Sequence, residues 1–189
     1  MATRAVYALI VVLGFAGALA VKAFYPGAAS PSRASAAFAA NPAWSEITWP
    51  FLMDQWGKGK AFRCKDADCG TDVELYVRAK IGFCNCATGV ADDEELERVA
   101  DVSLLDDRYA ALAAGHPIKI GHMAGRIRPY AVENASGQRT LAIAFNDRCD
   151  VIVATAVVAR GEPTIAEPAV LAFLNGDAMM RWAEVTLGM

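Results

Sequence analysis

The sequence has few of the residues and motifs on which most enzyme active sites depend. It contains two histidines, His116 and His122, so candidates for general-base catalysis are few. It lacks the phosphate-binding patterns G-x-G-x-x-G and G-x-x-x-x-G-K-[ST], the hydrolase patterns G-x-S-x-G and H-E-x-x-H, and the haem pattern C-x-x-C-H. These absences give no support to nucleotide, hydrolase or covalent haem chemistry, and we expect a protein that is not an enzyme.

Acidic residues are missing from positions 1–45, where the only charged side chains are Arg4, Lys22 and Arg33. Residues 46–189 hold the remaining 15 Lys and Arg against all 21 Asp and Glu, a balance of -6. Phosphate charge supplies much of the affinity of proteins for nucleic acids and anionic lipid surfaces. An acidic domain without a basic run therefore argues against both, and we expect no nucleic-acid partner.

The longest uncharged stretch of the chain lies near its N-terminus. The run from Ala5 to Val21 is apolar almost throughout and continues past Lys22 to Tyr25. That length approaches the roughly 20 residues that span a hydrocarbon core of about 30 Å. We therefore expect residues 1–25 to form a single-pass transmembrane helix in the inner membrane.

Two features of this segment predict where the rest of the chain lies. Arg4 favours the cytoplasmic side for the N-terminus, which puts the following residues on the periplasmic side. Ala18-Leu19-Ala20 also fits a signal-peptidase site, so the alternative to an anchor is a signal segment that is cleaved after Ala20 and releases the protein to the periplasm. Both interpretations export the domain and predict an oxidising compartment.

The remaining sequence divides into a linker and one domain. Residues 26–43 are rich in Pro, Gly, Ala and Ser and show no apolar periodicity, which is typical of a flexible linker. Residues 44–189 have a length typical of a single domain. Their predicted strands have short connections, which favour antiparallel pairing. We expect an α+β fold with one mainly antiparallel sheet and helices on one face.

Local patterns set the expected elements of this domain. The helix at Asp92 has the clearest start signal, because Glu95 three positions later completes a capping box. A second short helix is expected near Asp106. The expected strands cover residues 72–83, 118–123, 126–133, 139–145 and 151–160, and two further helices cover residues 168–174 and 177–187.

The cysteines give the most specific local signal. Cys64, Cys69, Cys84 and Cys86 are clustered in the pattern C-x4-C-x14-C-x-C, whereas Cys149 lies far downstream. Because exported chains meet oxidising conditions, we expect the four clustered cysteines to form two structural disulfides. Their pairing cannot be chosen from sequence alone. Cys149 is then expected to be a buried free thiol.

Two other uses of these cysteines stay open. Four thiolates suit a zinc ion, and copper(I) accepts fewer soft ligands, with His116 and His122 as further candidate donors. The C-x-C spacing is shorter than that of the usual zinc knuckles, however. The close pair Cys84 and Cys86 would alternatively serve thiol exchange. The alternative function is thus a periplasmic copper- or zinc-binding protein, or a thiol-disulfide handling protein.

Three tryptophans, Trp44, Trp49 and Trp56, lie close together in the stretch that opens the domain. Such rings bury large areas, either in the core of the domain or against another protein. We expect this stretch, the tryptophan segment (residues 44–56), to contact a partner. The leading prediction is a membrane-anchored, non-catalytic accessory or assembly subunit of a membrane protein complex, with no cofactor and a domain stabilised by disulfides.

Overall fold

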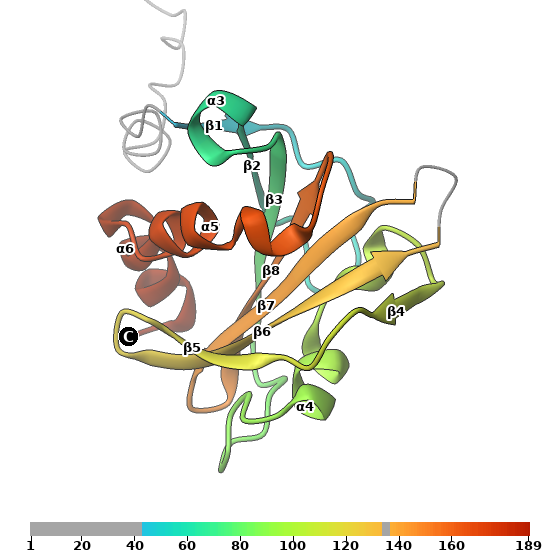
Figure 1. Cartoon of the computed structure of the whole chain (residues 1–189). Coiled ribbons are helices and arrows are strands. Elements are labelled where there is room, and N and C mark those ends of the chain that lie inside the picture. The colour runs from blue at the N-terminus through green and yellow to red at the C-terminus, as the bar shows by residue number, and fades with distance from the viewer. Residues whose placement is uncertain (1–42, 134–136) are drawn as a thin grey trace, which may run out of the picture. The chain divides into compact units, whose positions relative to one another are not determined.

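A computed structural model of the chain describes residues 43–133 and 137–189 (Figure 1). The predicted membrane segment, residues 1–25, lies outside these residues, as does all of the predicted linker except Ala43. Within the described ranges, no helix is long and apolar enough to cross a membrane.

The described residues form an α+β domain around one eight-stranded antiparallel sheet, which confirms the expected fold class. The strand order is β1-β2-β3-β8-β7-β6-β4, and β5 also pairs with β6. Every pairing is antiparallel, as the short connections predicted. The strands are β1 (Trp44–Ile47), β2 (Lys60–Cys64), β3 (Val73–Lys80), β4 (Tyr109–Ala111), β5 (His116–Ile120), β6 (Met123–Val132), β7 (Arg139–Asp147) and β8 (Asp150–Val158).

Helices and helical turns join or cover these strands. Two 3-10 turns, η1 and η2, precede β4 and α5 respectively. Figure 1 shows α5 and α6 side by side near the C-terminus. The helical elements are α3 (Asp66–Cys69), α4 (Asp93–Val99), η1 (Val102–Leu104), η2 (Pro163–Ile165), α5 (Glu167–Leu174) and α6 (Asp177–Leu187).

One face of the sheet packs against α5 and α6. Phe173 of α5 lies between two aromatic rings, with centroids 4.7 Å from Trp44 and 4.8 Å from Phe62. Met179 and Leu187 of α6 join the same core. This apolar layer explains why the two C-terminal helices form, because each has one side to bury against the strands.

The opposite face of the sheet is covered by α4, so the prediction of helices on one face is wrong. In β8, Ile152 points to the α5 and α6 side, whereas Val151 and Val153 pack with Leu96 and Val99 of α4. Successive side chains of a strand point to opposite faces, and β8 is apolar at nearly every position. A strand of this kind needs cover on both faces.

The predicted start of α4 is confirmed at its cap. The Asp92 carboxylate accepts a hydrogen bond from the Glu95 backbone N–H at 2.8 Å. Glu95 does not return a bond to Asp92, however; its carboxylate binds Arg98 and the Asn85 backbone N–H instead. The capping box is therefore half formed, and its acidic member connects the helix to the neighbouring loop.

The prediction of a short helix near Asp106 is wrong, because the chain forms strand β4 there. Tyr109 lies opposite Val132 of β6, and its ring contacts Tyr130 with a centroid separation of 5.7 Å. β5 pairs with β6 only as far as Ile127, whereas β6 continues to Val132. The end of β6 therefore offers backbone N–H and C=O groups to another strand. Satisfying those groups outweighs a weak local helix preference.

A cluster of buried charges lies on the α4 face of the sheet. Arg78 of β3 donates two hydrogen bonds to Asp101, at 2.5 and 2.8 Å, and two to Asp54, both at 2.8 Å. Lys80 lies 2.8 Å from Asp101 and donates to the Val99 carbonyl at 2.6 Å. The cluster thus ties the tryptophan segment, the end of α4 and the turn before η1 to one central strand.

The pKa shifts of this cluster reflect burial and pairing. Burial lowers the pKa of Lys80, and Asp101 offsets part of that effect. Burial alone would also lower the pKa of Arg78, but hydrogen bonds and charge from Asp101 and Asp54 raise it. Burial alone would raise the pKa of Asp54, but the hydrogen bonds from Arg78 and the Trp56 backbone lower it. Pairing thus favours the charged forms of Arg78 and Asp54 against the effect of burial.

Replacing Arg78 tests this cluster. We expect Arg78→Met to lower the free energy of unfolding by about 3 kcal/mol, because it leaves a buried carboxylate short of a partner. Arg63→Met is the matched control, since Arg63 is on the neighbouring strand and forms a half-exposed pair with Glu74. Its loss of unfolding free energy should be clearly smaller, because exposed ion pairs contribute little. Urea denaturation followed by tryptophan fluorescence measures both. Equal losses would contradict the assignment.

Candidate functional site

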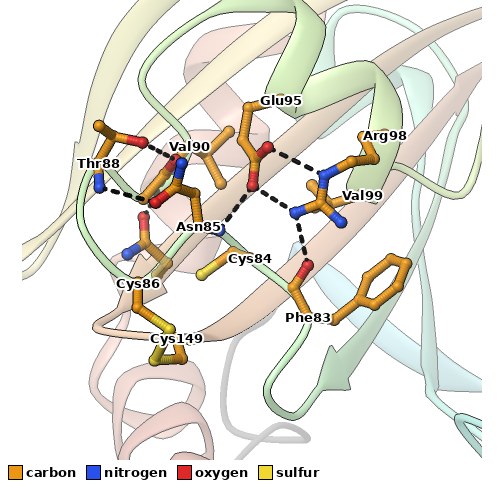
Figure 2. Close-up of polar contacts among 12 residues, drawn as sticks. Phe83, Cys84, Asn85, Cys86, Thr88, Val90, Glu95, Arg98, Val99 and Cys149 are labelled. Atoms are coloured by element: carbon orange, nitrogen blue, oxygen red, sulfur yellow. Dashed lines mark hydrogen bonds and ion pairs between the residues drawn. A yellow bond between two sulfur atoms is a disulfide. The ribbon is translucent and has the colours of Figure 1, made fainter.

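The cysteine site lies where two distant parts of the chain meet at one end of the sheet. The loop after β3 (residues 81–92) reaches the turn between β7 and β8 because β3 and β8 pair antiparallel, with Lys80 opposite Val151. Figure 2 shows Cys84, Cys86 and Cys149 close together in this region, beneath α4. A long-range strand pairing therefore builds the site.

The structure forms two disulfides, one of which differs from the expected set. Cys64 pairs with Cys69, with Cα atoms 6.1 Å apart. Cys86 pairs with Cys149, with Cα atoms 4.2 Å apart, and Cys84 keeps a free thiol. We expected Cys84 in a disulfide and Cys149 free, and the structure places the two the other way round. The β7–β8 turn, which brings Cys149 to the loop, is the reason.

Cys84 is buried, and its surroundings favour the neutral thiol. Its side chain belongs to the core beneath α4, it is 6% exposed, and its Sγ–H donates to the Arg148 carbonyl at 3.1 Å. Its backbone N–H also donates to the Cys149 carbonyl at 3.1 Å. Burial, followed by the charges of Glu95 and Asp150, raises the pKa of the thiol. Reactive cysteines have the opposite properties, namely exposure and a lowered pKa.

A hydrogen-bonded network holds the cysteine loop against α4 (Figure 2). The Glu95 carboxylate accepts from the Asn85 backbone N–H at 2.8 Å and from Arg98 at 3.0 Å. Arg98 also donates to the Phe83 carbonyl at 2.8 Å. On the other side of the loop, Asn146 of β7 accepts from the Val90 backbone N–H at 3.0 Å. The loop is thus fixed at both ends as well as by its disulfide.

The six candidate metal ligands do not form one site. Cys64, Cys69 and Cys86 are used in disulfides, and His116 Nε2 lies 3.0 Å from Glu167 Oε1. His122 is in the turn between β5 and β6. Across the described ranges, no three His, Cys, Asp or Glu side chains are grouped so that they could hold a metal ion. The geometry therefore does not favour the copper or zinc alternative.

The three tryptophans expected to contact a partner pack onto their own domain. Trp44 is 4% exposed and stacks on Phe173, so its assignment as a contact residue is wrong. Trp49 is half-buried against Phe51 and Tyr76. Trp56 is also half-buried, with its ring centroid 4.7 Å from that of Phe83. These rings fix the tryptophan segment to the sheet.

The exposed part of the tryptophan segment is its tip, which we define as Leu52 and Met53. Leu52 is 92% exposed and Met53 is 70% exposed. Asp54, the next residue, binds Arg78 and caps a turn by accepting from the Trp56 backbone N–H at 2.8 Å. The tip is therefore held in place from both sides while its apolar side chains face water. No signal in the sequence marks it, because an apolar pair beside aromatic residues is normally assigned to the core.

Comparison with known proteins identifies no family for this chain. No family model and no curated protein sequence matches it. Among solved structures, it is similar to the solution structure of cyanobacterial PsbP (CyanoP) from Synechocystis sp. PCC 6803. The identity is 11%, the TM-score is 0.40, and the match covers 70% of this chain and 77% of that chain. A likeness of this size assigns neither a family nor a function.

The cysteine pairing can be tested by sequential labelling. Alkylation of the native full chain at pH 8 should be slow, because Cys84 is buried and its pKa is raised. In denaturant, one thiol should react, and four more should react with a second reagent after reduction. Fragment mass spectrometry of the peptide that carries Cys84 and Cys86 should place the first label on Cys84. A first label on Cys86 or Cys149 would overturn the pairing.

The two disulfides should differ in their contribution to stability. A disulfide restricts the unfolded chain more when it closes a longer loop, which gives about 4 kcal/mol for a separation of 63 residues and about 2 kcal/mol for a separation of five. We therefore expect the double variant C86A/C149A to lose about twice as much unfolding free energy as C64A/C69A. Thermal and urea denaturation of both variants measure this. A larger loss in C64A/C69A would contradict it.

Proposed function

We propose that this chain is a non-catalytic accessory or assembly subunit of a membrane protein complex, and that it binds its partner through the tip, Leu52 and Met53. In this proposal, residues 1–25 anchor the chain in the inner membrane. The domain then lies on the periplasmic side. Binding, not chemistry, is its task.

The held, exposed tip is the observation that carries the proposal. Two adjacent large apolar side chains in water cost free energy, which is recovered when a partner covers them. They lie on a segment fixed by Arg78 and by the rings of Trp49 and Trp56, so little conformational entropy is lost on binding. Preorganised apolar residues of this kind are typical of contact surfaces.

Export is supported by the cysteines and by the N-terminal sequence. Disulfides persist in oxidising compartments and are rare in the cytosol. The described domain contains two of them, and the uncharged run that starts at Ala5 precedes it in the chain. A membrane anchor would also keep the domain close to other membrane proteins.

The cysteine geometry favours a structural role over thiol-disulfide handling. Cys86 and Cys149 are joined at the end of the sheet, and the remaining thiol of the cluster, Cys84, lies beneath α4 with a raised pKa. An exchange enzyme needs an accessible thiolate. We therefore assign the cluster to stabilising the loop that lies beside the tryptophan segment.

Removing the apolar surface of the tip tests the proposal. We expect the full-length double variant L52S/M53S to co-purify about tenfold less with its membrane complex, because loss of two buried apolar side chains costs more than about 1.4 kcal/mol of binding. The measurement is affinity purification from detergent-solubilised membranes of the native host, with quantitative mass spectrometry of the partners.

Val185→Ser is the matched control, because Val185 is 80% exposed on α6, far from the tip in sequence. It should leave co-purification unchanged. Both variants should keep the melting temperature of the wild type, since neither removes a buried contact. Unchanged partner recovery with L52S/M53S, or an equal loss with Val185→Ser, would contradict the proposal.

A further inference from the structure

An open groove of about 490 Å³ lies at the end of the sheet away from the tip. It is formed where β2 ends and β3 begins, together with the residues around the start of β7 and the end of β8. The tip adjoins Asp54, which binds Arg78 near the end of β3, whereas Val73 and Glu74 at the start of the same strand line the groove. Six charged residues line it: Arg63, Lys65, Asp72, Glu74, Arg139 and Arg160.

The backbone of the groove is fixed by hydrogen bonds between two of its walls. The Thr71 hydroxyl donates to the Arg160 carbonyl at 3.2 Å, and Thr71 is itself buried. The Ala159 backbone N–H donates to the Asp72 carbonyl at 3.0 Å. Residues 71–72 and 159–160 therefore hold each other in register. Their backbone sets the positions of Asp72 and Arg160 in the lining.

The charges of the groove are unbalanced. Four cationic and two acidic side chains leave an excess of two positive charges, in a domain whose overall balance is -6. Arg63 is paired with Glu74, and Arg139 is paired with Glu162. Lys65 and Arg160 are exposed, and neither forms an ion pair within the described residues. Glu162, outside the lining, neutralises Arg139, so with Asp72 counted the groove keeps one net positive charge. Lys65 and Arg160 are the two cations of the lining that are left for a ligand.

Glu74 does not compete for these two cations. Its carboxylate accepts a hydrogen bond from the Tyr76 hydroxyl and another from Arg63. The bond from Tyr76 is the largest cause of its lowered pKa, so Glu74 stays ionised and engaged with its own partners. Apolar side chains, among them Val157, complete the wall of the groove.

We infer that this groove binds an acidic peptide segment of a partner protein, with carboxylate side chains on Lys65 and Arg160. A guanidinium fork matches a carboxylate, and charge-assisted hydrogen bonds are the stronger class. A hollow with apolar walls accepts a peptide chain and one or two side chains. A flat anionic bilayer fits less well, because Asp72 and Glu74 lie in the same lining. The groove does not depend on the tip, and either site can fail alone.

Fluorescence anisotropy with the full chain in non-ionic detergent tests this assignment. The probe is a short labelled peptide in which three Glu alternate with Ala and Val, and the matched probe has Gln in place of Glu. We expect the Glu peptide to bind about tenfold more tightly than the Gln peptide and to weaken as salt is raised. The double variant K65A/R160A should raise the Kd for the Glu peptide about tenfold.

K58A/R181A is the matched control, because Lys58 and Arg181 are exposed residues outside the groove and their replacement changes the net charge equally. It should change the affinity less than about twofold. Equal losses in the two double variants, or equal binding of the two peptides, would overturn the inference.

Competition with small anions gives two further outcomes. Complete displacement of the peptide by acetate at the same carboxylate concentration would also overturn the inference, because the groove would then bind an adventitious ion only. Stronger displacement by glycerol phosphate than by unlabelled peptide would assign the groove to a lipid headgroup instead.

Discussion

The ion pair between Arg78 and Asp101 is the interaction on which the α4 face of this domain depends. Arg78 lies two residues before the end of the inner strand β3, and its two partners, Asp101 and Asp54, come from segments with little regular structure of their own. Taking such charges out of water is costly, and the cost is offset only while every partner stays in place. The cluster therefore links the positions of the tryptophan segment and of the turn after α4.

Short-range patterns predicted much of the fold. The β6–β7 and β7–β8 hairpins follow from alternation and turn residues, and the Asp92 cap marked the start of α4. The two C-terminal helices were found within a residue of their bounds. Each of these features depends on residues that are near one another in sequence. β4 did not follow, because its formation depends on the free edge of β6 and not on its own residues.

The cysteine site shows why the remainder could not be predicted. Cys84 and Cys86 are equally plausible partners for a disulfide by spacing, and the choice is made by Cys149, which arrives through the pairing of β3 with β8. The same limit applies to Trp44, whose burial depends on Phe173 near the other end of the chain. Conversely, the exposure of Leu52 could not be seen from a sequence in which apolar residues are normally assigned to the core.

Under the proposed export, the Cys86–Cys149 disulfide has a consequence for the order in which the two disulfides form. Cys64 and Cys69 emerge together and can be joined as soon as both have crossed, whereas Cys86 must wait for a partner at a sequence separation of 63. Throughout that interval, Cys84 is the nearest thiol to Cys86, so premature local oxidation competes with the native bond. Burial of Cys84 beneath α4 removes this competitor only once the helix has packed. Under the proposed export, the domain would thus benefit from a disulfide isomerase during its maturation.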